Sequence, residues 1–198
     1  MLFDTTIREI FQPGRTVLDI GAGLRVDAAR GNVVDPERAW IKPLLNGVTY
    51  QVLDPVDTYH PDIVGDVRDM KIADASYDAV LCLAVLEHVS KPWVAISEMR
   101  RVLKPGGILL CYVPFLSPYH AMPGYYGDYF RFTDDGIRSL LDGWTDVEIE
   151  PVRGPVETLA HLLPGKLHAL TVVGRFIDRF RKSSGKQVAG YTFSARKP

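Results

Sequence analysis

The chain has 198 residues, enough for one sizeable hydrophobic core but too few for two comfortable domains. Its formal net charge of -1 argues against nucleic acid as the main partner, and its 46% of hydrophobic residues matches ordinary globular domains. No stretch has the pattern of a signal peptide or approaches the roughly 20 apolar residues that span a bilayer, so we expect a cytoplasmic protein. The 2 cysteines lie in apolar runs, which favours buried free thiols, and no Cys/His cluster has metal-ligand spacing, so no metal site is expected.

The expected elements begin with a short amphipathic helix and a buried strand. The helix falls within residues 4–11 and ends before Pro13-Gly14, and the strand spans 15–20. A Gly-x-Gly turn at 21–23 follows at once, and its two glycines let the backbone turn sharply and approach a ligand closely. Asp19 stands near the carboxyl end of this strand, the edge where open α/β sheets bind ligands.

Further strands are predicted where short apolar or alternating runs lie between turn residues. They span 48–54, 62–66, 77–83, 108–113, 147–150 and 191–195. Helices are predicted where apolar residues recur at helical spacing. They span 36–45, 92–103 and 133–142, and two pieces of 156–182 that break near Pro164-Gly165. The alternation of strands and helices predicts βαβ units in a mostly parallel sheet, with the last strand antiparallel to the sixth.

Two segments lack a regular pattern. Residues 25–35 form an expected loop whose path the sequence leaves open. Residues 114–132 are rich in Pro, Gly and Tyr, and we expect a long ordered loop of the kind that often carries function.

Six motifs, in order and at consistent spacing, resemble the class I S-adenosylmethionine-dependent methyltransferases. They are Val17–Gly23, Leu53-Asp54, Gly65–Val67, Tyr77–Val80, Leu86–Val89 and Arg101–Gly107. The resemblance covers roughly residues 15–115 and is greatest to the branch that carries LEHV and RVLKPGG together, including its polysaccharide-associated members. It implies a three-layer, Rossmann-like methyltransferase fold with a seven-stranded, mostly parallel sheet and an antiparallel last strand. It also implies one domain over residues 1–198 and S-adenosylmethionine as cofactor.

The resemblance assigns residues to each part of that cofactor. The implied cofactor-binding residues are Asp19, Gly21, Ala22, Gly23, Asp54, Pro55, Asp66, Val67, Leu83 and Ala84. Asp19 and the glycine turn would face the amino-acid end, and Asp54 would accept from both ribose hydroxyls. Asp66 and the Val67 backbone would face the adenine, while Leu83 and Ala84 would lie near the sulfonium. The alternative for Asp54 and Asp66 is that each is an ordinary turn residue.

The sequence departs from the family pattern in two places. Arg25 stands where a third glycine is common, and Asp54 follows Asp19 by 35 positions, against about 20 in the usual dinucleotide-binding spacing. We interpret the difference as an insertion within residues 24–42. A nicotinamide-dependent oxidoreductase is disfavoured because Val26 stands where its last glycine is needed. Glu87-His88 either lies beside the cofactor or has a structural role.

The predicted substrate loop at 114–132 holds the candidate catalytic residues. His120 is the candidate general base because an imidazole titrates near neutrality, and Asp128 would orient it or bind a sugar hydroxyl. Tyr119, Tyr129 and Arg131 are the candidate substrate-binding residues. The structural alternatives are a hydrogen-bonded loop histidine, a turn aspartate, a small satellite core of tyrosines and an Asp128–Arg131 ion pair.

The sequence therefore predicts transfer of a methyl group from S-adenosylmethionine to an oxygen or nitrogen of a small-molecule or glycan-related acceptor. The alternative is a non-catalytic cofactor-binding or scaffold domain of the same fold. Residues 166–182 form a basic amphipathic segment. We favour a helix that covers the sheet, and peripheral membrane contact is the second interpretation.

Overall fold

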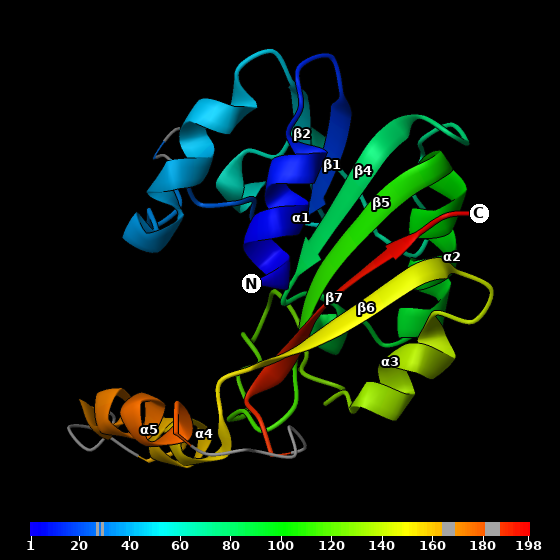
Figure 1. Cartoon of the computed structure of the whole chain (residues 1–198). Coiled ribbons are helices and arrows are strands. Elements are labelled where there is room, and N and C mark those ends of the chain that lie inside the picture. The colour runs from blue at the N-terminus through cyan, green and yellow to red at the C-terminus, as the bar shows by residue number, and fades with distance from the viewer. Residues whose placement is uncertain (27, 29, 164–168, 181–186) are drawn as a thin grey trace.

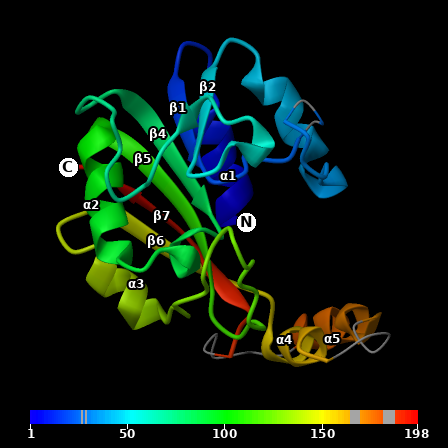
Figure 2. The same cartoon turned by 180° about the vertical axis from the view of Figure 1, so that it is seen from behind.

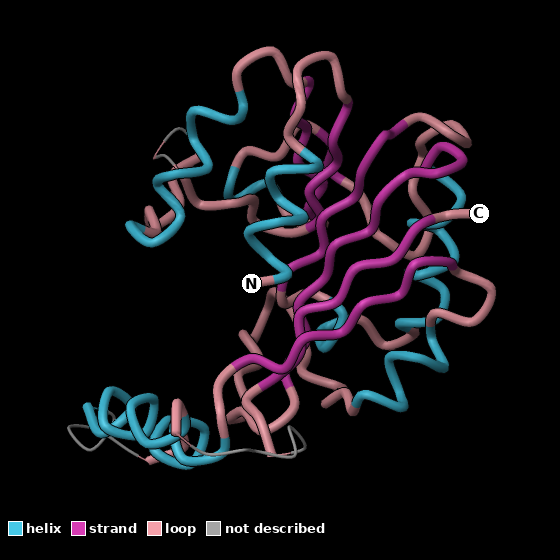
Figure 3. Tube along the Cα trace, viewed as in Figure 1, coloured by secondary structure: helices cyan, strands magenta, loops and turns pink. Residues whose placement is uncertain are grey.

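The computed structural model describes residues 1–26, 28, 30–163, 169–180 and 187–198. A seven-stranded sheet with the order β3-β2-β1-β4-β5-β7-β6 forms its centre (Figure 3). The strands are β1 (Thr16–Ile20), β2 (Thr49–Asp54), β3 (Ile63–Val64), β4 (Tyr77–Leu83), β5 (Leu103–Pro114), β6 (Thr145–Val152) and β7 (Gly190–Arg196). The first five strands pair in parallel, and β7 is antiparallel to both β5 and β6. The predicted fold class is confirmed.

Helices cover both faces of the sheet, which gives three layers (Figures 1 and 2). One face carries α1 (Leu2–Ile10) and a 3-10 segment at Pro36–Leu45, and the other carries α2 (Pro92–Val102) and α3 (Asp134–Leu140). Successive strand residues point to opposite faces, so each strand supplies both layers. In β4, for example, Ala79 and Leu81 pack with α1, while Val80 and Cys82 pack with α2.

The strand order creates a switch point beside β1. From β1 the chain proceeds outward to β2 and β3, and then returns to place β4 on the other side of β1. Open α/β sheets bind ligands outside the carboxyl ends of the strands at such a point. The loops that follow β1, β2 and β4 therefore meet at one edge.

Three predicted strands have the wrong bounds. β3 comprises only Ile63–Val64 rather than 62–66, β5 begins at Leu103 rather than at residue 108, and β6 spans Thr145–Val152 rather than 147–150. Tyr77 of β4 pairs with Leu103 of β5, but Ala79 already pairs with Ile108, so β5 has extra residues in this interval. Such an irregularity accommodates extra residues within a strand, so the predicted break at 104–107 is a bulge inside β5.

The favoured interpretation of the segment before β7, a helix covering the sheet, is also wrong. α4 (Pro155–His161) and α5 (Thr171–Asp178) pack on each other and lie beyond the end of the sheet (Figures 1 and 2). Gly174 lets them approach, because a Cβ there would lie 2.7 Å from the Glu157 backbone. Membrane contact through 166–182 remains a prediction, and residues 166–168, 181 and 182 fall outside the described residues. In the part of the chain described, every helix is too short or too polar to cross a membrane.

Candidate active site

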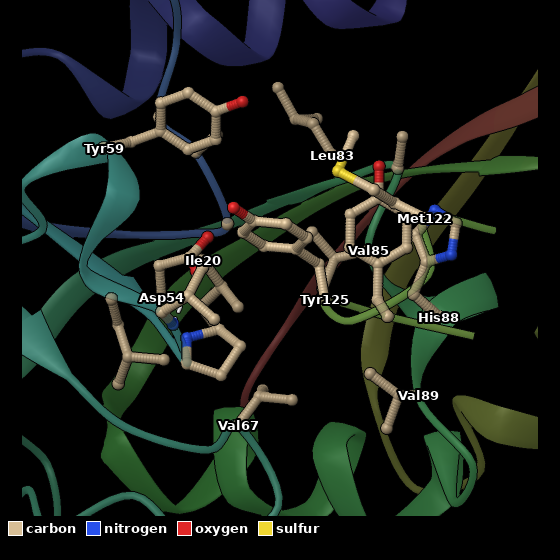
Figure 4. Close-up of a pocket in the computed structure, with 18 of the residues that line it drawn as sticks. Ile20, Asp54, Tyr59, Val67, Leu83, Val85, His88, Val89, Met122 and Tyr125 are labelled. Atoms are coloured by element: carbon tan, nitrogen blue, oxygen red, sulfur yellow. Dashed lines mark hydrogen bonds between the residues drawn. The ribbon is translucent and has the colours of Figure 1, made fainter. Parts of the chain in front are cut away.

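A cavity of about 730 Å³ opens at the carboxyl ends of β1, β2 and β4 (Figure 4). Its volume lies within the range of small-molecule and cofactor sites, about 300–1,000 Å³. All of the predicted cofactor residues line it: Asp19, Gly21, Ala22, Gly23, Asp54, Pro55, Asp66, Val67, Leu83 and Ala84. Residues predicted from separate motifs thus meet at one place, because each follows or ends a strand at the same edge.

Asp19 is almost wholly buried at this edge and holds a hydrogen bond within the protein. Tyr50 Oη donates to its Oδ2 at 2.5 Å, and the Leu24 backbone N–H donates to the Tyr50 oxygen at 3.0 Å. Burial raises the pKa of Asp19 to about 7, although the Tyr50 hydrogen bond opposes that shift. Sequence reasoning missed Tyr50, whose position depends on the pairing of Val17 with Tyr50 between β1 and β2.

Asp54 is oriented by its own turn. Its Oδ1 accepts from the Val56 backbone N–H at 2.9 Å, and burial raises its pKa. Among the described residues its Oδ2 has no hydrogen-bond partner. The carboxylate therefore keeps acceptor capacity on the wall of the cavity.

Asp66 is held differently. Arg68 Nε lies 3.0 Å from both of its carboxylate oxygens, and this pairing lowers the pKa of Asp66. Arg68 also donates to Ser90 Oγ at 2.8 Å. An adenine amino group at Asp66 would share its acceptor with Arg68, a partner that the sequence did not indicate.

Gly21 forms the bend after β1. Its φ is +110°, and a Cβ at this position would lie 2.8 Å from Val85 Cγ2, which also faces the cavity. Its backbone N–H donates to the Leu53 carbonyl at 2.8 Å, which ties the turn to β2. A side chain is therefore excluded both by the backbone conformation and by the neighbouring wall.

The far end of the cavity is aromatic and contains two histidines. Figure 4 shows Asp54 and Tyr59 on one side and His88 and Met122 on the other, with Tyr125 between them. The histidines of the cavity wall, and the lining residues from the loop after β5 that have large side chains, are His88, His120, Met122, Tyr125, Tyr126 and Tyr129. The His88 ring centroid lies 4.2 Å from that of Tyr126 and 4.8 Å from that of His120.

Glu87 lies behind the two histidines with its side chain buried. Its Oε1 is 3.6 Å from His120 Nε2 and 3.9 Å from His88 Nε2. Neither carboxylate oxygen has a hydrogen bond within the described part of the chain, and burial raises the pKa of Glu87 to about 7. Its backbone carbonyl accepts from the Tyr129 and Phe130 N–H groups, so the predicted substrate loop is fixed to this residue.

Three of the candidate residues in the substrate loop do not line the cavity. Asp128 and Arg131 form an ion pair in which Arg131 Nη1 donates to Oδ1 at 2.5 Å and Nη2 to Oδ2 at 2.7 Å. Asp128 also accepts from the His120 backbone N–H at 2.9 Å, and Arg131 donates to the Ser117 and Pro118 carbonyls. Tyr119 is 76% exposed. The pair therefore shapes the loop, whereas His120 and Tyr129 line the cavity.

Comparisons with known proteins find similarity to methyltransferases. A family model described as a methyltransferase domain matches residues 44–111, about a third of the chain. The human thiol S-methyltransferase TMT1B is 34% identical over 95 residues, which cover 46% of this chain and 39% of that protein. The chain thus spans about two fifths of the length of the curated relatives that it matches.

Solved structures extend the similarity to the whole fold. A SAM-dependent methyltransferase from Archaeoglobus fulgidus superposes with a TM-score of 0.61 at 18% identity, over 99% of this chain and 93% of that one. Phosphoethanolamine N-methyltransferase 2 from Haemonchus contortus, in complex with S-adenosyl-L-methionine, gives a TM-score of 0.57 at 16% identity, over 100% of this chain and 52% of that one. The chain therefore has the Rossmann-like fold of these solved methyltransferases, and its residues 44–111 match a methyltransferase-domain family model.

Proposed function

We propose that the chain binds S-adenosylmethionine in this cavity and transfers its methyl group to an oxygen or nitrogen of a small-molecule or glycan-related acceptor. The observation that carries the proposal is the meeting of Asp19, Asp54 and the Gly21–Gly23 turn around one cavity at the switch point of the sheet. The family match over residues 44–111 and the fold of the structural neighbours support the same class.

The cavity offers a suitable group for each part of the cofactor. Asp54 Oδ2 and the free capacity of Oδ1 suit two ribose hydroxyls, because one carboxylate can accept from two donors. Buried Asp19 suits the ammonium of the amino-acid moiety, which would compensate a carboxylate that burial otherwise disfavours. Leu83 and Ala84 at the end of β4 would leave the methyl group open to attack.

The aromatic end of the cavity would hold the acceptor. Methyl transfer needs the attacking atom in line with the methyl group, and a hydroxyl must also lose its proton. Tyr125, Tyr126 and Tyr129 offer faces for a ring or sugar, and His120, which lines the same cavity, would act on the attacking atom. Tyr119, Asp128 and Arg131 lie outside the cavity wall, so we assign the pair Asp128–Arg131 to positioning His120.

The first experiment is a calorimetric titration with S-adenosylhomocysteine, with NADH as the control ligand. We expect saturable binding of S-adenosylhomocysteine only. Loss of two hydrogen bonds to a charged group costs about 2–4 kcal/mol, so Asp54→Ala should weaken binding roughly 30-fold or more. Asp57→Ala, an exposed acid three residues further along, is the matched control and should bind as the wild type does.

Absence of binding at millimolar ligand, with the protein shown to be folded, would overturn the proposal. Where binding is found, transfer of labelled methyl groups to hydroxyl, amine and thiol acceptors separates the acceptor classes. The thiol arm is included because one relative is a thiol methyltransferase. Tight binding without transfer to any of them would favour the non-catalytic scaffold of the same fold.

A further inference from the structure

Three groups that can accept hydrogen bonds lie close together at the aromatic end of the cavity, where the substrate that receives the methyl group would bind. They are a Glu87 carboxylate oxygen and one ring nitrogen from each of His88 and His120, and all lie within 4.8 Å of one another. Glu87 and His88 lie in the single 3-10 turn Leu86–His88 that follows β4, whereas His120 comes from the loop after β5. Glu87, His88 and His120 do not have the sequence spacing of a known metal-binding motif. The sequence therefore does not indicate a metal site here.

The hydrogen bonds behind both rings determine which nitrogen carries the proton. His88 Nδ1 lies 2.6 Å from the Gly127 carbonyl, and His120 Nδ1 lies 3.0 Å from the Pro118 carbonyl. A carbonyl oxygen only accepts, so His88 Nδ1 must be the donor. The shorter contact of His120 Nδ1 with Pro118, against 3.5 Å to Arg131 Nη2, favours the same tautomer there. In the neutral rings each Nε2 therefore presents a lone pair, and both Nε2 atoms face Glu87. Histidine ligands of metals are usually oriented by a hydrogen bond of this kind from the second ring nitrogen.

The buried Glu87 carboxyl would gain a partner from a cation, because burial alone favours its neutral form. It is wholly buried, and within the described residues neither oxygen has a donor. Buried polar groups are nearly always paired, and an unpaired buried charge is costly. A carboxylate and two lone pairs that lie within 4.8 Å of one another would be compensated by a positive ion placed among them.

We propose that Glu87, His88 and His120 bind a divalent transition-metal ion such as Zn²⁺. Two imidazoles and one carboxylate are a common three-ligand set for catalytic zinc, and imidazole favours transition metals, whereas Mg²⁺ prefers oxygen ligands. Ligands about 2.0–2.1 Å from a tetrahedral ion lie roughly 3.3 Å apart. The distances of 3.6 and 3.9 Å from Glu87 Oε1 to the two Nε2 atoms exceed this by a few tenths of an ångström, and the three ligand atoms all lie within 4.8 Å of one another, so the side chains would close in when the ion binds.

The ion would have an open position toward the cavity, because His88 and His120 both belong to its wall. A role in transfer rests on the proposed function. An acceptor hydroxyl bound at that position would lose its proton to solvent more readily, because a metal ion lowers the pKa of a bound hydroxyl. Its oxygen would then form the new bond to the methyl carbon, while the carbon–sulfur bond breaks and its electron pair stays on sulfur. His120 would act as a ligand of the ion rather than as the base.

The test titrates metal-free protein with Zn²⁺ by calorimetry and with Co²⁺ by visible absorbance, without cofactor. We expect one ion per chain for each metal and no saturable binding of Mg²⁺. Glu87→Gln, which keeps the side-chain shape, and His120→Ala should each weaken Zn²⁺ binding by at least about tenfold. His60→Ala removes an exposed histidine outside the group and should leave the affinity unchanged.

Failure of folded wild-type protein to bind Zn²⁺ or Co²⁺ would overturn the proposal, as would equal affinity in Glu87→Gln and His120→Ala. Because the His120 side chain is 41% exposed, His120→Ala remains informative if Glu87→Gln does not fold. The titration with S-adenosylhomocysteine is independent of this one. If the protein does not bind S-adenosylhomocysteine, the Zn²⁺ titration still tests the metal site. If it does not bind Zn²⁺, the S-adenosylhomocysteine titration still tests the cofactor site.

Discussion

At the scale of single residues, Gly21 shows how closely the backbone is fitted to the cavity. A positive φ costs a residue other than glycine about 1–2 kcal/mol, and Gly14, which precedes β1, also has a positive φ of +84°. The two glycines differ in their surroundings. A Cβ at Gly14 would meet nothing within 4 Å, whereas one at Gly21 would push against Val85.

We therefore expect Gly21→Ala and Gly14→Ala to lose similar stability from backbone strain but to differ in ligand binding. Gly21→Ala should weaken S-adenosylhomocysteine binding by roughly tenfold or more, because Val85 must move into the cavity. Gly14→Ala should leave the dissociation constant within about twofold of wild type. Thermal unfolding and calorimetry of both variants give the comparison, and equal affinities would show that the Gly21 turn does not shape the ligand site.

The residues that the sequence could predict are those set by local pattern. The positions of Asp19, Asp54 and the glycine turn follow from recognisable strand ends, and the resemblance to a known family supplies their expected roles. Tyr50 could not be predicted, because its contact with Asp19 depends on the register of β1 against β2. The approach of His120 to Glu87 likewise depends on the path of a long loop, which no local preference determines.

At the scale of elements, one ion pair helps to hold the loop between β5 and α3, beside the backbone bonds to Glu87. The Asp128 side chain is buried, and Arg131 holds both of its oxygens while also donating to two loop carbonyls. Arg131 holds the Asp128 pKa well below its usual range. A guanidinium can bind a carboxylate with two parallel hydrogen bonds, which a lysine cannot reproduce.

Arg131→Lys is accordingly expected to loosen this loop while leaving the sheet intact. Hydrogen exchange of amides in 117–131 should accelerate by roughly tenfold, because several anchoring bonds are lost together. Arg138→Lys is the matched control, since Arg138 pairs with Asp134 on the exposed surface of α3. Equal exchange rates in both variants would mean that the loop is held by other contacts, such as those to the Glu87 carbonyl.

The element pattern itself was largely predictable, because strands and helices differ in apolar periodicity. The placement of α4 and α5 was not. Their apolar residues have the spacing of a helix that covers a sheet, but Gly174 and the Arg175–Glu157 ion pair direct the two helices onto each other. Periodicity predicts that a helix has an apolar side, but it does not predict the surface against which that side packs.

At the scale of the whole molecule, Asp19 links stability to pH. Its pKa is about 7 in the folded chain and 3.8 when solvated, so the folded state binds this proton more tightly. The contribution of this bound proton to the free energy of unfolding is complete below about pH 4 and is lost as the pH rises through 7. Asp19→Asn removes this dependence. The variant should therefore gain about 2 kcal/mol in unfolding free energy relative to wild type between pH 5 and 8.

Urea unfolding of both proteins at several pH values measures this difference, and Asp57→Asn serves as the exposed control with no such trend. Saturating S-adenosylhomocysteine should flatten the wild-type dependence, because an ammonium beside Asp19 favours the ionised carboxylate. A constant difference between Asp19→Asn and wild type across this range would contradict a buried, proton-binding Asp19.

The position of β7 has a consequence for how the protein is made. Residues 190–196 are the last of the seven strands to be synthesised, yet they lie between β5 and β6. On the ribosome, β1 to β5 can assemble as the nascent chain emerges, but β5 then presents an open edge and β6 has no neighbour to pair with. An unpaired edge of this kind attracts other chains. The interval before residues 190–196 leave the exit tunnel is therefore the stage at which a chaperone would protect this protein most.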